Sequence, residues 1–283
     1  MNDLVGASDF HLHTSPDVRE RWYDDVQAAR LADEHRMYAI VLKSHWTTTA
    51  DRAIMAATAA NVQVTKIYGG LVLNNSVGGL NPAALEKSLE LGAKVIWMPT
   101  HDAAFHRVRH GGRGGIRLIE SPTSLELRNA AKAVIDMCIE AGAIIATGHI
   151  APSEIAALGR YGQPRGAKIV VTHPEWVPTR VSVAEQKELS EYGIMFERCF
   201  IGTTSAAHDW QQPMSSLVEE IRTVGVRYTV LSSDLGIKYG PEPFVGFIEF
   251  YDQLQKEGIS KQELELMSRE NPRRLLDEPR SIL

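Results

Sequence analysis

Ten histidines are spread along this chain, and nine of them fall in one kind of position. Six lie at or just beyond the C-terminal ends of short apolar runs, and these are His11, His13, His45, His101, His149 and His173. His106, His110 and His208 follow such runs in connecting segments, whereas only His35 precedes one. Neutral imidazole is the commonest metal ligand in proteins, and its pKa lies close to neutral pH. The grouping predicts a metal site or an acid–base site.

The spacing of these residues predicts which of them share that site. Side chains alternate along a strand, so His11 and His13 point to the same side and can chelate one cation. His149 and His173 end two later runs, and Asp234 ends the last one. A carboxylate at that place can bind the metal or take a proton from its water. We expect these five residues to be the metal ligands, with Asp234 also catalytic.

Eight apolar runs must position these side chains. They are Asp9–His13, Tyr38–His45, Val64–Leu73, Lys94–Thr100, Ala143–His149, Lys168–His173, Ile194–Cys199 and Arg227–Ser233. Several are nearly continuous in apolar residues, which is typical of strands buried on both faces of a parallel sheet. Helix-length segments separate them. Asn81-Pro82 and Ser121 to Thr123 predict helix starts, and glycines at 92, 142, 193 and 225 predict helix ends.

Eight strand–helix units of roughly 30 residues predict an α/β fold, a (β/α)₈ TIM barrel that forms a single domain over residues 1–283. In such a barrel the active site lies at the C-terminal ends of the strands, where the nine histidines fall. A doubly wound open sheet is the alternative. It would usually carry a glycine-rich loop after its first strand, whereas this chain has Thr14-Ser15 there.

Composition limits the partners and the compartment. The chain has 30 basic and 35 acidic residues, a net charge of −5, which disfavours nucleic acid as a partner. Cys138 and Cys199 are its only cysteines, so a cysteine zinc cage and a disulfide framework are excluded. We find neither a signal peptide nor an apolar run of the ~20 residues that a membrane span needs. We expect a cytoplasmic protein that acts on a small molecule, and a homo-oligomer stays open.

The ordered set of His11, His13, His149, His173 and Asp234 resembles the amidohydrolase superfamily of metal-dependent hydrolases. The segment Glu270-Asn271-Pro272-Arg273-Arg274-Leu275-Leu276 is similar to the end of many members. The resemblance implies a divalent cofactor, zinc first and manganese as the alternative, in one or two ions. It also implies hydrolysis of an amide, ester, lactone or related bond. His11 and His13 would bind one metal, His149 and His173 the same metal or a second, and Asp234 would be a ligand or the base.

One departure from that pattern concerns the anion that bridges two metals. Binuclear members carry a carbamylated lysine, a glutamate or a cysteine at the end of the fourth strand, where this chain has Met98-Pro99-Thr100-His101. The nearest candidate is Lys43, on the second strand. A buried lysine must be paired, shifted in pKa or modified. Lys43 is therefore either carbamylated or an amine paired with Asp234 or Glu197, and the sequence favours one metal.

Further residues are candidates for catalysis, namely His101 and Lys43, or for binding the substrate, namely His45, Arg109 and Arg113. His45 and His101 lie at strand ends where they can stabilise an oxyanion. Arg109 and Arg113 belong to the long glycine-rich connection 101–120, where guanidinium groups suit a carboxylate or a phosphate. That connection is equally typical of a solvated hairpin or a subunit contact. Glu197 is expected to orient a ligand histidine.

Two alternative functions stay open. A metal-dependent decarboxylase on the same barrel would use the ion to orient a carboxylate without attack by water. The segment His11 to Asp17 also resembles the polymerase-and-histidinol-phosphatase family of metallo-phosphoesterases. The chain departs from that family at three places, Lys43-Ser44-His45, Asn74-Asn75 and Gly236, so the hydrolase is favoured.

Overall fold

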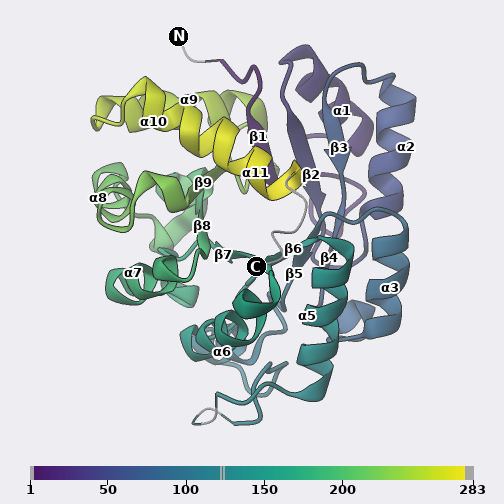
Figure 1. Ribbon diagram of the computed structural model, residues 1–283. Helices are drawn as coiled ribbons and strands as arrows, with labels where there is room; N and C mark the ends of the chain where they lie inside the picture. The colour runs from purple at the N-terminus through teal and green to yellow at the C-terminus, as the bar shows by residue number, and fades with distance from the viewer. Residues whose placement is uncertain (1–2, 122, 124, 278–283) are drawn as a thin grey trace.

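The computed structural model describes residues 3–121, 123 and 125–277 and has a ring of parallel strands at its centre (Figure 1). The strands are β1 (Ser8–His13), β2 (Ala39–Lys43), β3 (Lys66–Tyr68), β4 (Gly70–Val72), β5 (Val95–Trp97), β6 (Ile144–Ala146), β7 (Lys168–Thr172), β8 (Met195–Cys199) and β9 (Thr229–Ser232). β1, β2 and β3 form one parallel sheet, and β4 to β9 form another in chain order.

Two contacts join these sheets into a closed barrel. β3 continues into β4 through Gly69, so both belong to the third predicted strand. On the other side Leu12 forms a parallel bridge with Leu235, and the His13 backbone N–H donates to the Leu235 carbonyl at 2.9 Å. All eight predicted strands are therefore present, and the fold is a (β/α)₈ barrel.

Helices surround the ring of strands (Figure 1). The outer helices are α1 (Asp25–Glu34), α2 (Ala50–Ala60), α3 (Pro82–Glu90), α5 (Asn129–Ala141), α6 (Pro152–Gly162), α7 (Val183–Glu191), α8 (Met214–Val224) and α9 (Pro243–Lys256). The short α4 (Ala104–Arg109) lies in the connection after β5, and α10 (Lys261–Glu265) and α11 (Asn271–Asp277) end the described chain. No helix in the described part of the chain is long and apolar enough to cross a membrane.

Most of the helix starts and ends predicted from the sequence are confirmed, and one predicted start is wrong. Asn81 caps α3 by accepting from the N–H groups of Ala83 and Ala84, as predicted. The glycines at 92, 142, 193 and 225 all have positive φ at helix ends. The start predicted at Ser121 to Thr123 is wrong, because α5 begins at Asn129. An antiparallel bridge between Ile119 and Leu127 turns the chain back before the helix begins.

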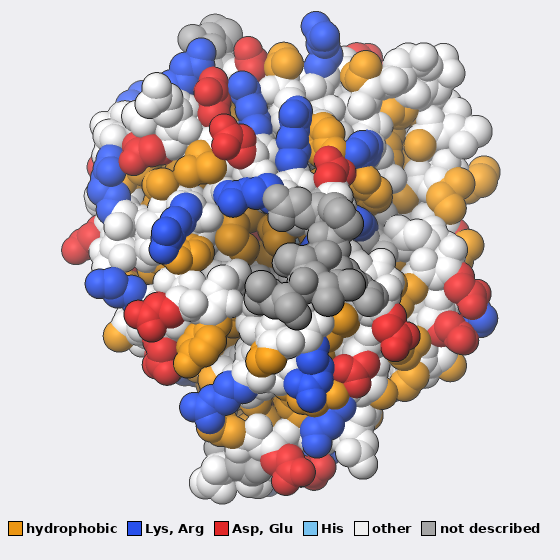
Figure 2. Space-filling view, viewed as in Figure 1, with side chains coloured by type: hydrophobic (Ala, Val, Ile, Leu, Met, Phe, Trp, Pro, Cys, Tyr) orange, Lys and Arg blue, Asp and Glu red, His pale blue; other side chains and the backbone are white. Residues whose placement is uncertain are grey.

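The interior of the barrel is apolar at one end and polar at the other. Side chains such as Val41, Val95, Trp97 and Ile144 fill the interior towards the end where the strands begin. Leu276 of α11 belongs to the same cluster. α11 crosses the end where the strands begin (Figure 1), and Figure 2 shows acidic and basic side chains interspersed over that face. The amino-terminal end of the barrel is thus closed, and a site must open at the other end.

We predict that Gly69→Ala destabilises the barrel. A Cβ at this position would lie 2.1 Å from the backbone carbonyl oxygen of Thr49, so the junction of β3 and β4 would have to move away from the start of α2. Overpacking of this kind costs about 1–3 kcal/mol or more of unfolding free energy. Urea denaturation measures it, with Gly202→Ala as the control because nothing lies within 4 Å of a Cβ there. Equal midpoints for the two variants would contradict the close approach.

Candidate metal centre

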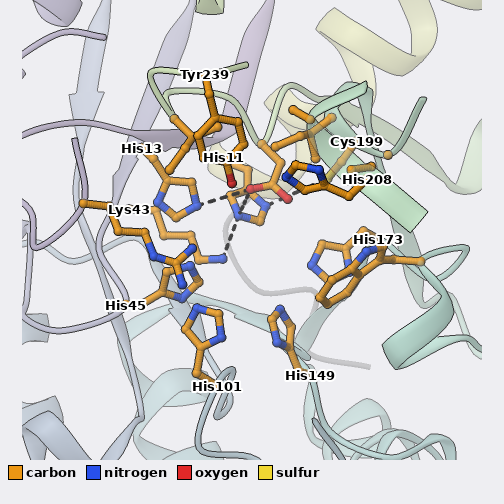
Figure 3. A pocket seen from close by; sticks show the side chains of 18 of the residues that line it. His11, His13, Lys43, His45, His101, His149, His173, Cys199, His208 and Tyr239 are labelled. Carbon is orange, nitrogen blue, oxygen red and sulfur yellow. Dashed lines mark hydrogen bonds and ion pairs between the residues drawn. The ribbon is translucent and has the colours of Figure 1, made fainter. Parts of the chain in front are cut away.

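A cavity of about 230 Å³ opens where the strands end. Most of the site residues predicted from the sequence line it, and these are His11, His13, Lys43, His45, His101, His149, His173 and Asp234. Figure 3 shows the histidine and lysine side chains of this set arranged around one central space. They come from the ends of six strands, so the barrel brings together residues that lie far apart in the chain.

The closest group of potential ligand atoms joins the first and last strands. His11 Nε2 lies 2.9 Å from Asp234 Oδ1, and His13 Nε2 lies 3.2 Å from the same oxygen (Figure 3). Neighbouring ligands of a tetrahedral ion bound at about 2.1 Å are separated by about 3.4 Å. One nitrogen of His11 and one of His13 thus lie at nearly that spacing from a single carboxylate oxygen of Asp234.

The backbone around this group is adapted to hold it. The register between β1 and β2 shifts between Asp9 and Leu12, which marks a bulge. Asp9 Oδ1 fixes the bulge by accepting from the N–H groups of His11 and Ser233, at 3.0 Å each. Asp234 has φ +51° and His173 has φ +29°, a region that such residues rarely adopt. Strained backbone of this kind is concentrated at functional sites.

Glu197 and Lys43 contact His11 from opposite ring nitrogens. Glu197 Oε2 lies 3.3 Å from His11 Nδ1, so the expected contact between this carboxylate and a candidate ligand histidine is present. Lys43 Nζ lies 2.6 Å from His11 Nε2 and 5.0 Å from the centre of the Trp97 ring. Its direct hydrogen-bond partner is thus His11 rather than the carboxylates expected from the sequence. Carbamylation of Lys43 stays a prediction.

Most of the imidazoles are held in their neutral form. Burial is the largest cause in each case, and it lowers the pKa of His13, His45 and His149 well below the usual value. It also lowers the pKa of His101 and His173 to about 4 and that of His106 to about 3. A neutral ring offers one nitrogen lone pair to a metal. The cavity is therefore rich in ligands that are ready to bind a cation.

Asp234 and His11 behave differently because they face each other. Burial alone would raise the pKa of Asp234, but the His11 and His13 rings hold it well below its usual range. Burial lowers the pKa of His11, and the Asp234 and Glu197 carboxylates outweigh that effect and raise it. An ionised carboxylate among imidazoles is the donor set that zinc and similar divalent ions prefer. The residues present fit such an ion.

His149 and His173 extend the site away from β1. The His173 ring is 6.1 Å from that of His11 and 5.1 Å from that of His149. His149 Nδ1 lies 2.9 Å from His106 Nδ1, and the ligand atoms of His101, His106 and His149 all lie within 4.8 Å of one another. The five ligands predicted from the sequence therefore line one cavity, but His149 belongs to a second cluster of imidazoles.

The predicted substrate-binding residues divide into two groups. His45 lines the cavity with its ring 4.3 Å from that of His101, and its Nδ1 lies 2.9 Å from Thr100 Oγ1. Arg109 and Arg113 are exposed and are not among the residues that line the cavity. The connection after β5 folds into α4, which buries His106, and Arg109 lies over the ring of Phe105.

Sequence reasoning missed several residues that the barrel brings to the site. Arg19 and Arg21 line the cavity in place of Arg109 and Arg113, and their position soon after the first strand was the available signal. Cys199 Sγ lies 3.9 Å from His11 Nδ1 and could join a ligand group with His11 and Asp234. Glu175, two residues after His173, also lines the cavity. Burial raises its pKa to about 6.

Comparisons with known proteins agree with this architecture. Residues 6–197 match the family model described as "Family of unknown function (DUF6282)", and the chain therefore belongs to that family. No curated protein matches the sequence.

Several solved structures share the fold. An amidohydrolase from Pseudomonas aeruginosa is 12% identical, with a TM-score of 0.64 over 95% of each chain. A metallopeptidase, dipeptidase AC, is also 12% identical, with a TM-score of 0.66 over 97% of this chain and 98% of that one. A putative 2-pyrone-4,6-dicarboxylic acid hydrolase from Pseudomonas putida is 17% identical, with a TM-score of 0.59 over 96% and 97%. The chain thus has the barrel fold of the amidohydrolases.

Proposed function

We propose that this DUF6282 member is a metal-dependent hydrolase that uses water to cleave an amide, ester, lactone or related bond of a small anionic substrate. The observation that carries the proposal is that His11 Nε2 and His13 Nε2 lie 2.9 and 3.2 Å from one oxygen, Asp234 Oδ1, at the open end of the barrel. Solved structures with the same fold, which include an amidohydrolase and a dipeptidase, support it.

His11, His13 and Asp234 would hold the ion, with His173 as the nearest further imidazole. Imidazole nitrogens combined with one carboxylate favour zinc, and manganese is the alternative. When bound, a divalent ion lowers the pKa of a coordinated water from about 15.7 towards about 7. Glu197 orients His11 through its Nδ1 atom and so fixes the direction of the other ring nitrogen.

Asp234 is the group placed to move the proton. Its low pKa keeps the carboxylate ionised at neutral pH, so it can accept a proton from the attacking water and return it to the leaving group. His45 is fixed through Nδ1 by Thr100 and faces the cavity, where an N–H group would stabilise the developing oxyanion. Lys43 adds a buried amine whose Nζ lies 2.6 Å from His11 Nε2.

The cavity favours a small anion with an apolar body. Arg19 and Arg21 supply cationic groups, and Arg21 Nε is buried without a hydrogen-bond partner. Arg21 Nη2 donates to Asp17 Oδ2 at 3.0 Å and lies 3.4 Å from His13 Nδ1. Trp176 and Ile237 contribute apolar surface. A volume of about 230 Å³ is below the ~300–1,000 Å³ that is typical of drug-sized ligands.

We predict that His11→Ala and His13→Ala each lose one metal ion per chain together with activity, because each variant removes a donor from the same ligand group. Elemental analysis of the zinc-loaded protein measures the metal. His35→Ala is the control, since His35 stacks on Phe244 away from the cavity. Full metal content in both test variants would contradict the assignment.

We predict that Asp234→Asn slows turnover by ~10²-fold or more, because the amide cannot accept the proton and general acid–base catalysis contributes at least that factor. A panel of lactones, amides and esters of small carboxylic acids supplies the substrates, and circular dichroism checks the fold. Asp136→Asn is the control, since Asp136 pairs with Tyr161 outside the cavity. Turnover within a few-fold of the unmodified protein would assign Asp234 a structural role.

The same assay separates hydrolysis from decarboxylation. Hydrolysis in ¹⁸O-labelled water places one labelled oxygen in the product, because water is the attacking group. Release of carbon dioxide from an aromatic or unsaturated acid, without incorporation of label into the organic product, would replace the hydrolase proposal with the decarboxylase.

We predict that Arg21→Met raises KM for carboxylate-bearing substrates by about tenfold or more and leaves KM for neutral analogues nearly unchanged. A hydrogen bond to a charged group contributes about 1.5–3 kcal/mol, which corresponds to that factor. Arg113→Met, in the exposed connection, is the matched control. If Arg113→Met raises KM and Arg21→Met does not, the anion binds at the connection after β5, as the sequence suggested.

A further inference from the structure

We propose that His101, His106 and His149 form a second divalent-metal site, separate from the group of His11, His13 and Asp234. The inference goes beyond the proposed function, which needs only one ion. It also reassigns His149, which the sequence grouped with His11 and His13. The two groups of donor atoms share no residue.

The geometry of the three rings supports the site. One ligand atom from each lies within 4.8 Å of the other two. His149 Nδ1 and His106 Nδ1 are 2.9 Å apart, and His101 Nδ1 and His106 Nε2 are 3.4 Å apart. A neutral imidazole has one N–H group and one lone pair, so in the metal-free protein these two contacts are N–H···N hydrogen bonds. A cation bound to one nitrogen of each ring would replace them with coordination.

A buried nitrogen without a partner provides the second observation. His101 Nε2 is buried and has no hydrogen-bond partner among the described residues. Most buried polar atoms in proteins are hydrogen-bonded, so each exception requires a cause. Coordination of an ion by His101 would supply one.

The elements around the cluster hold the rings in place. His101 and His149 follow β5 and β6, and the connection after β5 places His106 on α4. α4 is tied down where the Ala104 N–H donates to the Ile116 carbonyl at 2.9 Å. The Trp176 ring lies 5.1 Å from that of His149. Rings fixed in this way lose little freedom when they bind an ion.

The chemistry of the donors restricts which ion binds. Three imidazoles without a carboxylate suit zinc, cobalt, nickel or copper rather than magnesium or calcium, which prefer oxygen. Three protein ligands also leave a coordination position for water or substrate. His101 and His149 line the cavity, so an ion held by them adjoins the space in which the proposed substrate binds.

Metal counting in paired variants tests the inference. The protein is stripped with a chelator, reloaded with Zn²⁺ or Co²⁺, dialysed and analysed for metal per chain, and the visible spectrum of the cobalt form is recorded. We expect two ions in the unmodified protein and one in His106→Ala, in His101→Gln and in His13→Ala. The double variant His13→Ala/His106→Ala should hold none. His110→Ala is the matched control, because His110 stacks on His106 from the next turn of chain, and should keep two.

Loss of one ligand histidine should weaken binding of one ion by more than the 10–100-fold that is typical of a lost supporting residue. The cobalt spectra of His106→Ala and His13→Ala should differ, because a different site remains filled in each variant. Circular dichroism verifies folding, and His101→Gln, which keeps a polar side chain, serves if His106→Ala does not fold.

Two ions in both His106→Ala and His101→Gln would overturn the inference, as would a single ion in the unmodified protein that these variants retain. Loss of all metal from His13→Ala would also overturn it, since a single shared centre would then be present. None of these results contradicts a metal site formed by His11, His13 and Asp234, so the proposed function would stand. The opposite result, in which His13→Ala keeps every ion and His106→Ala loses one, would support the second site and contradict the proposed function.

Discussion

The site depends on the contact that closes the barrel between its first and last strands. Leu12 pairs with Leu235, and Asp9 accepts hydrogen bonds from the backbone N–H groups of His11 and Ser233. These bonds bring His11 and His13 against Asp234, which lies more than two hundred residues further along the chain. Gly236 belongs to the same seam, because a Cβ there would lie 1.9 Å from the His13 carbonyl oxygen. A histidine at that position, as the phosphoesterase pattern requires, would not fit.

Burial of polar groups at the open end has a cost that only mutual contacts can offset. Lys43 is 1% exposed and Glu197 is 2% exposed, and an unpaired charge so deep in a protein is strongly unfavourable. His11 lies between them and contacts both, through Nε2 and Nδ1. The barrel therefore keeps cationic and anionic groups in balance around one imidazole. The His11 and His13 rings keep the pKa of Asp234 low, whereas burial lowers the pKa of the neighbouring His13 ring.

The sequence predicted the parts of the fold and the site that depend on strand periodicity. Each strand ends within three residues of the end of its predicted run, so the residues at those ends, such as His13 and Asp234, were found together with the fold. Side chains in connections were harder to place, because their direction depends on loop conformation and not on alternation. His106 points inward from α4 whereas Arg109 is exposed, and no periodicity distinguishes them. The same limit explains why Arg19 and Arg21 were missed and why the start of α5 was misplaced.

The number of metal ions is where sequence and structure lead to different expectations. Without a bridging anion after the fourth barrel strand, the sequence favours one ion, because two dications about 4 Å apart repel strongly even at an effective dielectric constant of about 20. That argument assumes that a second ion would share the ligands of the first. The cluster of His101, His106 and His149 removes the assumption, since it offers donors of its own and none of them belongs to the first group. His106 comes from a short helix in the connection after β5. With His106 as a ligand, the second ion would not need an anion from the end of the strand. A barrel can thus gain a second ligand group by extending a loop rather than by changing the residue at a strand end.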